Sequence, residues 1–463
     1  MPHGSLKSLF SQTQTLFTQT FRNVTSALFV TGDQGLITTS IIAPFIDLKE
    51  RLKDPQDLQK NLKARNLSIN VESLKEKWSQ LLEMCEIRNR LTDHSKSLIE
   101  ELSQRVNSSN IDEGNSASAV EQYRLRQKLV KQDIKFISHM IQELEKITIF
   151  EGLRLPNYIH KDTPLDREKV QYSYDNGDES KTANLDHVEI GKKLELLEFS
   201  DEISYYLLNQ AVQFELALTD YFASNLINNF GFMNFSNTDF CKSVVIEGVG
   251  HRLKEENSVF RLQDYSETPN EDEQTFLVGG ASLEPFCAYH CKSTIDESTL
   301  PLKYVTQGRS YSSSSLYNFK GLYSVVQTNS VKIFIATNNN EEAMMNEFNL
   351  ILQTLTDLYK RFNLTFRYTF VPASSLNLWE SLKVSFQIYS PYHKQFIEVG
   401  ELSISDDFIS KRLRMHYHKR KKDPLFMKII SGKVVNVAPF LACILERSQD
   451  DFIIPECLRN HTL

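Results

Sequence analysis

The sequence lacks three features that mark common functional classes. No apolar run approaches the roughly 20 residues that a membrane-spanning helix requires, so we expect no membrane span. The six cysteines are scattered without a Cys-x-x-Cys pair, which removes the usual zinc signature and suits a reducing compartment. The 59 Asp and Glu residues outnumber the 52 Lys and Arg residues, and this net charge of −7 argues against a generally basic nucleic-acid-binding surface, though not against a local patch.

One small group of potential metal ligands is present. Cys287, His290 and Cys291 lie close together on a segment that we expect to be helical. Buried thiols are common in core helices, so packing explains these residues better than a metal does. The sequence therefore predicts no metal site.

The first 32 residues contain no acidic residue, many Ser and Thr residues, and Lys7 and Arg22 as basic residues. Apolar residues recur there at the spacing of one helical face: Leu6, Phe10, Phe17, Phe21, Val24 and Leu28. This pattern is typical of a mitochondrial transit peptide and unlike a secretory signal, which needs a compact apolar centre. We expect residues 1–32 to be a transit segment and the protein to be in the mitochondrial matrix. The alternative is a disordered N-terminal arm.

A long helical hairpin is predicted at about residues 56–150, within an N-terminal domain of residues 33–154. The first helix has apolar positions at Leu74, Trp78, Leu81, Cys85, Leu98, Leu102 and Val106. A polar break at residues 107–118 predicts a turn. The second helix has a seam with alternating steps of three and four residues at Val120, Tyr123, Val130, Ile134, Ile137, Ile141 and Leu144, with Gln127 at one seam position. Two such helices joined by a turn predict an antiparallel coiled coil.

The rest of the chain has a different pattern. Residues 155–182 are rich in Asp, Tyr, Asn and Gly and poor in aliphatic residues, which predicts a linker. Residues 183–463 contain strand-like runs at 304–306, 322–326, 366–371 and 383–389, together with an amphipathic helix at 341–362. With 41% hydrophobic residues in 463, the chain is long enough for a large core and more than one domain. The expected fold class is α+β.

Several stretches resemble the seryl-tRNA synthetase family of class II aminoacyl-tRNA synthetases. Residues 276–290 read FLVGGASLEPFCAYH, similar to the family's LYLIGTAEVPLAAYH, and residues 300–315 read LPLKYVTQGRSYSSSS, similar to LPLRYVAFSTCFRTEAG. Residues 428–446, KIISGKVVNVAPFLACILE, resemble the third class II motif, HTLNGSGLAVGRTLAAILE. The resemblance extends from the hairpin to the tail at 452–463. It implies an N-terminal coiled-coil arm, an antiparallel β-sheet domain flanked by helices, and a dimer.

The resemblance also implies that the family's reactive side chains are replaced. The amine-binding Thr and Glu, the second-motif Arg and Glu, the metal-holding carboxylate and the ATP-stacking Arg fall, in that order, on Gly280, Ser282, Ser312, Ser314, Lys332 and Pro439. Serine and proline offer neither the charge nor the planar fork that stabilises a reacting phosphate. An ammonium group at Lys332 repels magnesium. We therefore expect no catalytic residue, no cofactor and no enzymatic activity. The conserved frame falls on Gly279, Leu300, Pro301, Tyr304, Gly321, Leu445 and Glu446.

Two groups of basic residues are candidates for nucleic-acid contacts. The second helix of the hairpin carries Arg124, Arg126, Lys128, Lys131 and Lys135. The segment KRLRMHYHKRKK carries Lys411, Arg412, Arg414, Lys419, Arg420, Lys421 and Lys422. Such charge density suits a phosphate backbone, and the resemblance implies that the arm reaches a tRNA across a dimer. The alternative explanation is a solvated face of mixed charge for the first group and a solvated loop between two strands for the second.

Three functional hypotheses follow. The first is a non-catalytic paralogue that forms a dimer, with itself or with an active mitochondrial seryl-tRNA synthetase, and helps to bind tRNA. The second is an independent mitochondrial protein that binds RNA or DNA or has a regulatory role. The third, least favoured, is an active serine–tRNA ligase or another adenylating enzyme with a rebuilt pocket.

Overall fold

The computed structural model describes residues 26–28, 42, 44–108, 113–177, 183–201, 204–252, 259–263, 274–311, 319–419, 424–448 and 450–461. Most of the expected transit segment and the candidate positions Ser312, Ser314, Arg420, Lys421 and Lys422 lie outside these residues. The chain divides into two compact units. The first contains Asp47–Pro55 and Asn70–Leu153, and the second contains Ile42–Ile46, Gln56–Ile69 and Arg154–Leu463.

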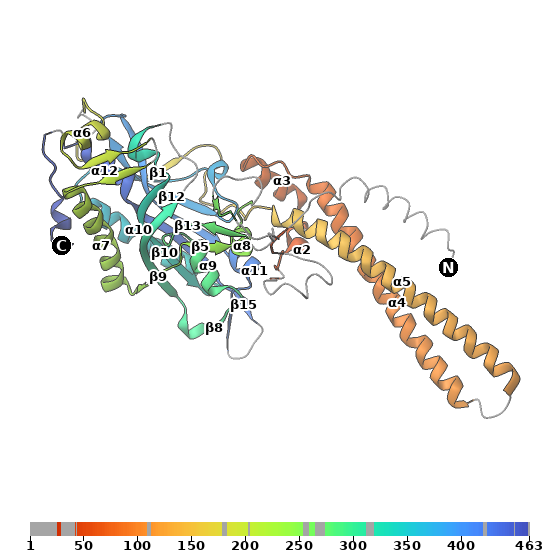
Figure 1. The fold of residues 1–463 in the computed structure, drawn as a ribbon. Coiled ribbons are helices and arrows are strands. Elements are labelled where there is room, and N and C mark those ends of the chain that lie inside the picture. The colour runs from red at the N-terminus through yellow and green to blue at the C-terminus, as the bar shows by residue number, and fades with distance from the viewer. Residues whose placement is uncertain are drawn as a thin grey trace. The chain divides into compact units, whose positions relative to one another are not determined.

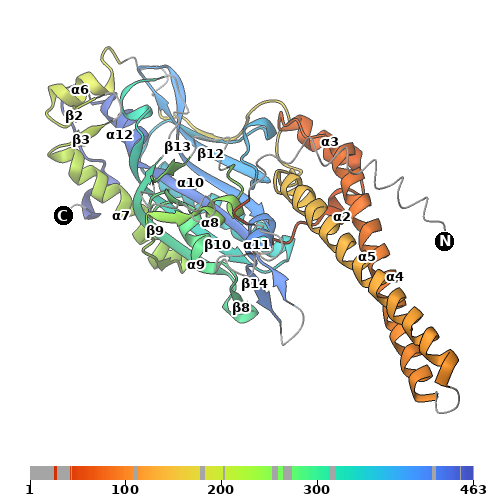
Figure 2. The same cartoon turned by 45° about the vertical axis from the view of Figure 1, so that its right-hand side comes forward.

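The first unit is dominated by two long helices, α4 (Val71–Ser108) and α5 (Glu113–Leu153), which run side by side in opposite directions (Figures 1 and 2). A short helix, α2 (Leu48–Arg51), belongs to the same unit. Part of the predicted seam is buried: Leu81, Ile137, Ile141 and Leu144 form one apolar cluster, which also includes Met84. The structure confirms the helical hairpin, but α5 begins at Glu113, so the second half of the predicted break at 107–118 is helical.

The second unit is built on an eight-stranded sheet in the order β1-β11-β12-β13-β16-β10-β9-β4. The strands are β1 (Lys169–Tyr174), β11 (Phe366–Phe370), β12 (Leu382–Ser390), β13 (Gln395–Asp406), β16 (Lys428–Asn436), β10 (Gln327–Thr337), β9 (Leu302–Tyr311) and β4 (Met233–Asn234). All neighbouring pairs are antiparallel except β4 and β9. The expected α+β class with an antiparallel sheet is thus confirmed.

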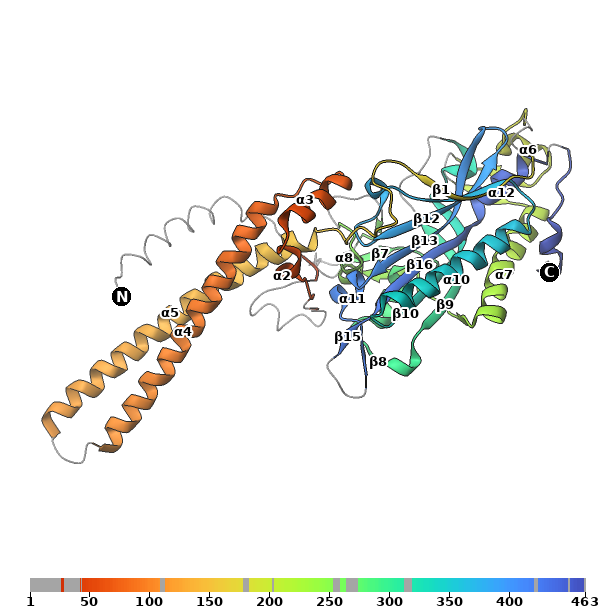
Figure 3. The same cartoon turned by 180° about the vertical axis from the view of Figure 1, so that it is seen from behind.

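Three helices share one large apolar core with this sheet. They are α7 (Gln210–Phe230), α10 (Glu341–Lys360) and α12 (Val437–Leu445), and Figure 3 shows α7 and α10 beside the strands. The core is rich in aromatic rings, including Phe214, Phe222, Tyr359 and Phe440. Helix α12 is buried along its whole length, so its apolar run packs on all sides instead of forming one stripe.

Shorter elements complete the second unit. The helices are α3 (Pro55–Ala64), α6 (His187–Lys193), α8 (Ser243–Val249), α9 (Glu284–His290) and α11 (Phe408–Leu413). The small sheets are β2 (Leu197–Phe199) with β3 (Tyr205–Leu207), β5 (Phe240–Lys242) and β6 (Phe260–Arg261) with β7 (Thr275–Leu277), and β8 (Thr294–Asp296) and β15 (Leu425–Phe426) with β14 (His416–His418). Short 3₁₀ turns are η4 (Glu297–Thr299), η5 (Gly321–Tyr323), η6 (Ala373–Ser375) and η7 (Glu456–His461).

The boundaries differ from the sequence-based expectation at two points. Residues 56–69, expected in the arm domain, belong to the second unit, where Arg65 donates to the carbonyl oxygens of Asn377 at 3.0 Å and Glu380 at 2.5 Å. The segment 155–182, expected to be a linker, contributes the edge strand β1, which pairs with β11. Alternating polar and aromatic residues on an exposed edge strand resemble a polar loop in sequence, because only one face needs to be apolar.

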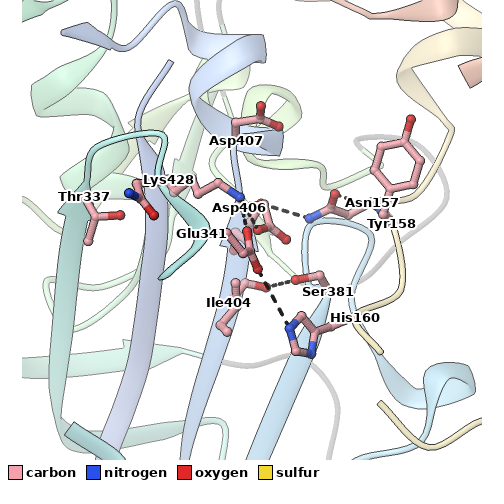
Figure 4. A network of polar contacts seen from close by, with 12 residues as sticks. Asn157, Tyr158, His160, Thr337, Glu341, Ser381, Ile404, Asp406, Asp407 and Lys428 are labelled. Carbon is pink, nitrogen blue, oxygen red and sulfur yellow. Dashed lines mark hydrogen bonds and ion pairs between the residues drawn. The ribbon is translucent and has the colours of Figure 1, made fainter. Parts of the chain in front are cut away.

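The beginning of this segment is held against the end of the sheet (Figure 4). The Asn157 side-chain amide donates to the carbonyl oxygens of Trp379 and Ser405, both at 2.9 Å, and the His160 backbone N–H donates to the carbonyl oxygen of Ser381 at 3.0 Å. Nearby, Lys428 Nζ pairs with Glu341 at 2.5 Å and with Asp406 at 3.1 Å. These bonds fix the loop that carries Trp379 and Glu380.

Among the helices of the described part of the chain, none combines the length and apolar character that crossing a bilayer requires.

Candidate functional site

Four adjacent central strands place a group of charged side chains together. Strand β10 contributes Lys332, β12 contributes Lys383, β13 contributes Glu398 and Glu401, and β16 contributes Lys433. Lys332 and Lys433 are direct partners in the β10–β16 ladder. Like charges opposite each other in a sheet repel, so this arrangement needs carboxylates nearby.

Glu401 lies between two of the ammonium groups. Its Oε2 is 2.6 Å from Lys383 Nζ and its Oε1 is 3.4 Å from Lys332 Nζ. Lys383 also approaches Glu398 at 4.0 Å, and the Ser385 hydroxyl donates to Glu398 at 2.5 Å. Within the described residues, the Lys433 ammonium group makes no hydrogen bond or ion pair. The group therefore holds three ammonium groups against two carboxylates.

The pKa values follow from this crowding. Burial alone raises the pKa of Glu401, but the ammonium groups of Lys383, Lys332 and Lys433 outweigh it and hold the pKa below its ordinary value. Burial raises the pKa of Glu398, and Lys383 opposes this only in part. Burial lowers the pKa of Lys433, and the neighbouring Lys332 lowers it further against the attraction of Glu401.

A cavity of about 120 Å³ lies over these strands. Its lining includes Ser282 and Glu284 from the segment around α9, Ser310 and Tyr311 from β9, Trp379 and Glu380 from the loop before β12, and Lys332, Glu401, Ser403, Ser431 and Lys433 from the sheet. Glu284 is buried, and its Oε1 is 2.7 Å from His251 Nε2. Burial acts to raise the pKa of Glu284, but this hydrogen bond and the charge of His251 bring it below its ordinary value.

The predicted degenerate positions are only partly together. Ser282 and Lys332 line the cavity, and the Ser282 hydroxyl donates to the Val278 carbonyl oxygen at 2.6 Å. Gly280 is nearby in sequence, but its N–H donates to Asp239 at 2.7 Å and its carbonyl oxygen accepts from Asn237 at 3.0 Å. Pro439 is buried in the first turns of α12 and does not line the cavity.

Sequence reasoning missed most of the charged lining. The sequence analysis did not select Glu284, Glu401 and Lys433, which line the cavity, or Lys383, which pairs with Glu401. A charged residue in an otherwise apolar strand run, such as Lys383 in LKVSFQIYS, was the available signal. It is weak, because only the strand register shows which face such a residue occupies.

Packing accounts for the Cys287 and His290 side chains on α9. His290 is stacked with the rings of Tyr304 and Phe334, and burial lowers its pKa to about 4. Cys287 is fully buried, and burial raises its pKa well above the ordinary value. A neutral imidazole in an aromatic cluster and an inert thiol are structural features.

The basic residues of the arm face solvent. Arg124, Arg126, Lys128, Lys131 and Lys135 are exposed on α5, and among the described residues the only ion pair of this set joins Arg124 to Glu121 at 4.0 Å. Arg124, Lys128, Lys131 and Lys135 line an open surface groove of about 380 Å³ with Gln127 and Gln132. This is a cationic surface available for an anionic partner.

The described part of the second basic segment is less uniform. Arg412 is buried, with its guanidinium carbon 3.4 Å from the centre of the Phe408 ring. Lys411 pairs with Asp407 at 3.0 Å and Lys419 pairs with Glu297 at 3.3 Å. Arg414 ends α11 in the left-handed conformation, with φ of 56°. These residues do not form one continuous cationic surface, and their role in nucleic-acid binding stays a prediction.

Comparison with known proteins gives consistent relatives along nearly the whole chain. No protein-family model matches. The chain is 29% identical over 437 residues to the serine–tRNA synthetase-like protein Slimp of Drosophila melanogaster, covering 92% of this chain and 89% of that protein. It is 24% identical over 441 residues to the serine–tRNA ligase of Treponema denticola, covering 89% and 97%. The chain is a relative of the seryl-tRNA synthetases.

Solved structures of seryl-tRNA synthetases share the fold. The enzyme of Pyrococcus horikoshii, complexed with ATP, matches with a TM-score of 0.77 and 19% identity over 90% of this chain and 97% of that one. The cytoplasmic enzyme of Naegleria fowleri, in complex with AMP, matches with a TM-score of 0.74 and 17% identity over 90% and 96%. The family's arm and sheet domain are thus both present.

The retained frame of the family has a structural reason at two glycines. Gly279 has φ of +89°, and a Cβ there would lie 2.2 Å from the Arg309 carbonyl oxygen. Gly321 has φ of +71°, and a Cβ there would lie 2.3 Å from His187 Nε2. Only glycine satisfies both the backbone conformation and the close approach.

Glu446, also in that frame, joins several elements. Its carboxylate accepts hydrogen bonds from Ser390 at 2.5 Å and Tyr323 at 2.8 Å and lies 3.3 Å from His187 Nδ1. It therefore connects α12 to β12, η5 and α6.

Proposed function

We propose that this seryl-tRNA synthetase relative is a non-catalytic paralogue that acts as a structural or regulatory dimer subunit. The observation that carries this proposal is the Lys332 ammonium group, which lies in the cavity and pairs with Glu401. By resemblance, this position holds a carboxylate that helps to bind ATP and magnesium. A cation there repels the metal that neutralises the triphosphate.

The rate argument supports the same conclusion. Loss of a single preorganised charge-stabilising donor costs roughly 10² to 10³ in rate. Here the sequence has serine at 312 and 314 and proline at 439 where the resemblance places charged groups. Neighbouring residues supply no planar guanidinium in the described cavity lining, so no bidentate clamp is available there for an α-phosphate.

Pyrophosphate exchange tests the loss of activity. The full chain is incubated with ATP, labelled pyrophosphate and each standard amino acid, with the Treponema denticola serine–tRNA ligase as the positive control. We expect no amino-acid-dependent exchange. A clear signal with serine or another amino acid would establish the third hypothesis, an adenylating enzyme with a rebuilt pocket.

For the partner, we propose either a second copy of this chain or an active mitochondrial seryl-tRNA synthetase. Exposed apolar residues support an interface on the second unit: Val212 and Leu216 on α7 are 38% and 44% exposed, and Met233 on the edge strand β4 is 61% exposed. Co-purification from mitochondria, followed by mass measurement of the native complex, identifies the partner. Recovery of self-pairs alone would eliminate the mixed dimer.

For tRNA, the α5 surface supports a contribution from the arm. Reversing Lys128, Lys131 and Lys135 to Glu should abolish salt-sensitive tRNA binding without changing the helical content. Reversal of the exposed but more distant Lys96 on α4, paired with Asp93 at 3.3 Å, is the control. Equal tRNA binding by the triple variant would remove the arm from the proposal.

The second candidate function is an independent mitochondrial nucleic-acid-binding or regulatory protein. The exposed cations of α5 favour it, because they need no synthetase partner. It predicts salt-sensitive RNA or DNA binding by the isolated chain, and loss of that binding when Lys419, Arg420, Lys421 and Lys422 are neutralised. Binding seen only in a complex with a synthetase would contradict it.

A further inference from the structure

We propose that the charged cavity of the second unit is a binding site for a small oxyanion, a carboxylate or a phosphate, held by the ammonium groups of Lys433 and Lys332. This goes beyond a dimer subunit, because it gives the altered pocket a ligand of its own. It does not depend on whether the chain is catalytically inactive.

The ammonium group of Lys433 lies in the cavity lining without a partner among the described residues. Its side chain extends from β16 into the cavity lining, directly across the ladder from Lys332. Within the described residues, no acceptor lies in hydrogen-bonding or ion-pair distance of Lys433 Nζ. A partly buried ammonium group without a counter-ion is costly, and a bound anion is the simplest way to satisfy it.

The carboxylates around Lys433 have other partners. The carboxylate of Glu401 pairs with Lys383 at 2.6 Å and with Lys332 at 3.4 Å, so both of its oxygens already have a cationic partner other than Lys433. Glu398 lies beside Lys383 and accepts a hydrogen bond from the Ser385 hydroxyl. Glu284 pairs with His251 at 2.7 Å, and Glu380 accepts a hydrogen bond from the Asn377 N–H at 2.8 Å. The lining holds three carboxylates and two ammonium groups, and of these two ammonium groups Lys433 is the one without an ion pair among the described residues.

The neutral lining suits an oxyanion as well. Ser310, Ser403 and Ser431 bring hydroxyl groups to the cavity, and Tyr311 brings a phenol. Hydroxyl and ammonium donors together are what carboxylate and phosphate oxygens accept from. A cationic ligand beside these donors would instead be repelled by the two ammonium groups in the lining, Lys332 and Lys433.

The size of the cavity limits the ligand. The described residues enclose about 120 Å³, whereas sites for drug-sized molecules measure roughly 300 to 1,000 Å³. A molecule with a handful of non-hydrogen atoms fits, such as a short carboxylic acid or inorganic phosphate.

Anion binding is measured on the full-length chain with a Trp78→Phe change, so that Trp379 in the cavity wall is the only tryptophan. Inorganic phosphate, acetate and methylammonium are titrated separately at constant ionic strength, with Trp379 fluorescence and the thermal unfolding temperature as readouts. We expect saturable changes with phosphate or acetate and a higher unfolding temperature at saturation. Tighter phosphate binding would identify a phosphate site, and tighter acetate binding a carboxylate site.

Two lysine variants on the same strand complete the test. Lys433→Met should lower the affinity for the anion about tenfold or more, because a hydrogen bond to a charged group is lost. Lys428→Met is the matched control, because Lys428 is on β16 but is paired with Glu341 and Asp406 outside the cavity lining. Circular dichroism confirms that both variants are folded. The proposal is overturned if neither anion gives a saturable change, if methylammonium binds instead, or if Lys433→Met binds the anion as well as the unaltered chain does.

Discussion

At the scale of single residues, Glu401 is the carboxylate that pairs with two lysines of the central strands. It is the carboxylate closest to Lys383 and Lys332, and its side chain is 21% exposed. Removing one member of a largely buried ion pair leaves the other charge without compensation, which typically costs 3–5 kcal/mol.

We expect Glu401→Gln to lower the free energy of unfolding by about 3 kcal/mol, measured by urea denaturation at pH 7. Glu195→Gln, an exposed change after α6, should alter it by less than about 0.5 kcal/mol. Adding Lys383→Met to Glu401→Gln should recover part of the loss, since it removes the stranded ammonium group. Equal changes in the free energy of unfolding for Glu401→Gln and Glu195→Gln would show that water already solvates the lysines around Glu401.

The same carboxylate predicts a pH dependence. The pKa of Glu401 in the folded protein is below its ordinary value of 4.5, so the unfolded state binds the proton more tightly. Its contribution to stability is therefore complete above about pH 4.5 and is lost as the pH falls through the folded pKa. The difference in stability between the unaltered chain and Glu401→Gln should shrink on acidification, as followed by urea denaturation at stepwise lower pH.

For Lys433 we expect substitution to change the free energy of unfolding in the opposite direction. In chloride buffer without phosphate or carboxylate, Lys433→Met should raise the free energy of unfolding at pH 7 by about 1 kcal/mol, because an uncompensated ammonium group is removed. The folded pKa of Lys433 is below 10.5, so the unfolded state binds more protons, and the stability of the unaltered chain rises with pH in that range. The advantage of Lys433→Met should shrink toward pH 10.5.

Lys428 is the control for that measurement. Its ion pairs with Glu341 and Asp406 raise its pKa above 10.5 against the lowering effect of burial, so its contribution to stability is lost as the pH rises through that raised value. Lys428→Met should be destabilising at pH 7. If both variants changed the free energy of unfolding in the same direction, the ion pairs of Lys428 would not explain the difference between these two lysines.

At the scale of elements, the arm offers a comparison between buried and exposed apolar residues. Ile137 of α5 is 4% exposed and belongs to the cluster with Leu81 and Met84, whereas Leu129 of the same helix is 52% exposed. Ile137→Ala should destabilise the arm by about 2–4 kcal/mol, from lost burial and the cavity left behind. Leu129→Ala should change it by less than about 0.5 kcal/mol, with thermal loss of helical circular dichroism as the measurement. Similar effects would mean that the exposed face of α5 is covered.

The elements also show what sequence could predict. The helical hairpin was predictable because its seam repeats over many turns at a fixed period, as at Ile134, Ile137 and Ile141. The start of α5 was misplaced because Gly, Asn and Ser at 114–118 favour a turn, and pairing with a long partner helix overrides that preference. Strand β1 was not predicted within the expected linker, because an edge strand needs few apolar residues.

The cavity was less predictable than the fold. Its main feature is the pairing of Lys332 with Lys433, which are about a hundred residues apart and meet only through the β10–β16 register. A resemblance identified the position of Lys332, but it could not show that Lys332 and Lys383 share the carboxylate of Glu401. Those contacts are properties of neighbouring strands and not of any one segment.

At the scale of the whole molecule, the division into two units predicts unfolding in more than one step. The chain has two tryptophans, Trp78 in the first unit and Trp379 in the second, so each reports on one unit. Single-tryptophan variants, Trp78→Phe and Trp379→Phe, should give fluorescence transitions with different urea midpoints. Ile137→Ala should shift only the Trp78 transition. Coincident midpoints that move together would show that the chain unfolds as one cooperative body.

The ion pair between Lys332 and Glu401 also determines what a charge reversal at position 332 would do. A carboxylate there would lose the attraction to Glu401 and gain one to Lys433, its direct partner across the β10–β16 ladder. Reversing this one charge would therefore move the ion pair from β13 to β16 and leave Glu401 with Lys383 alone.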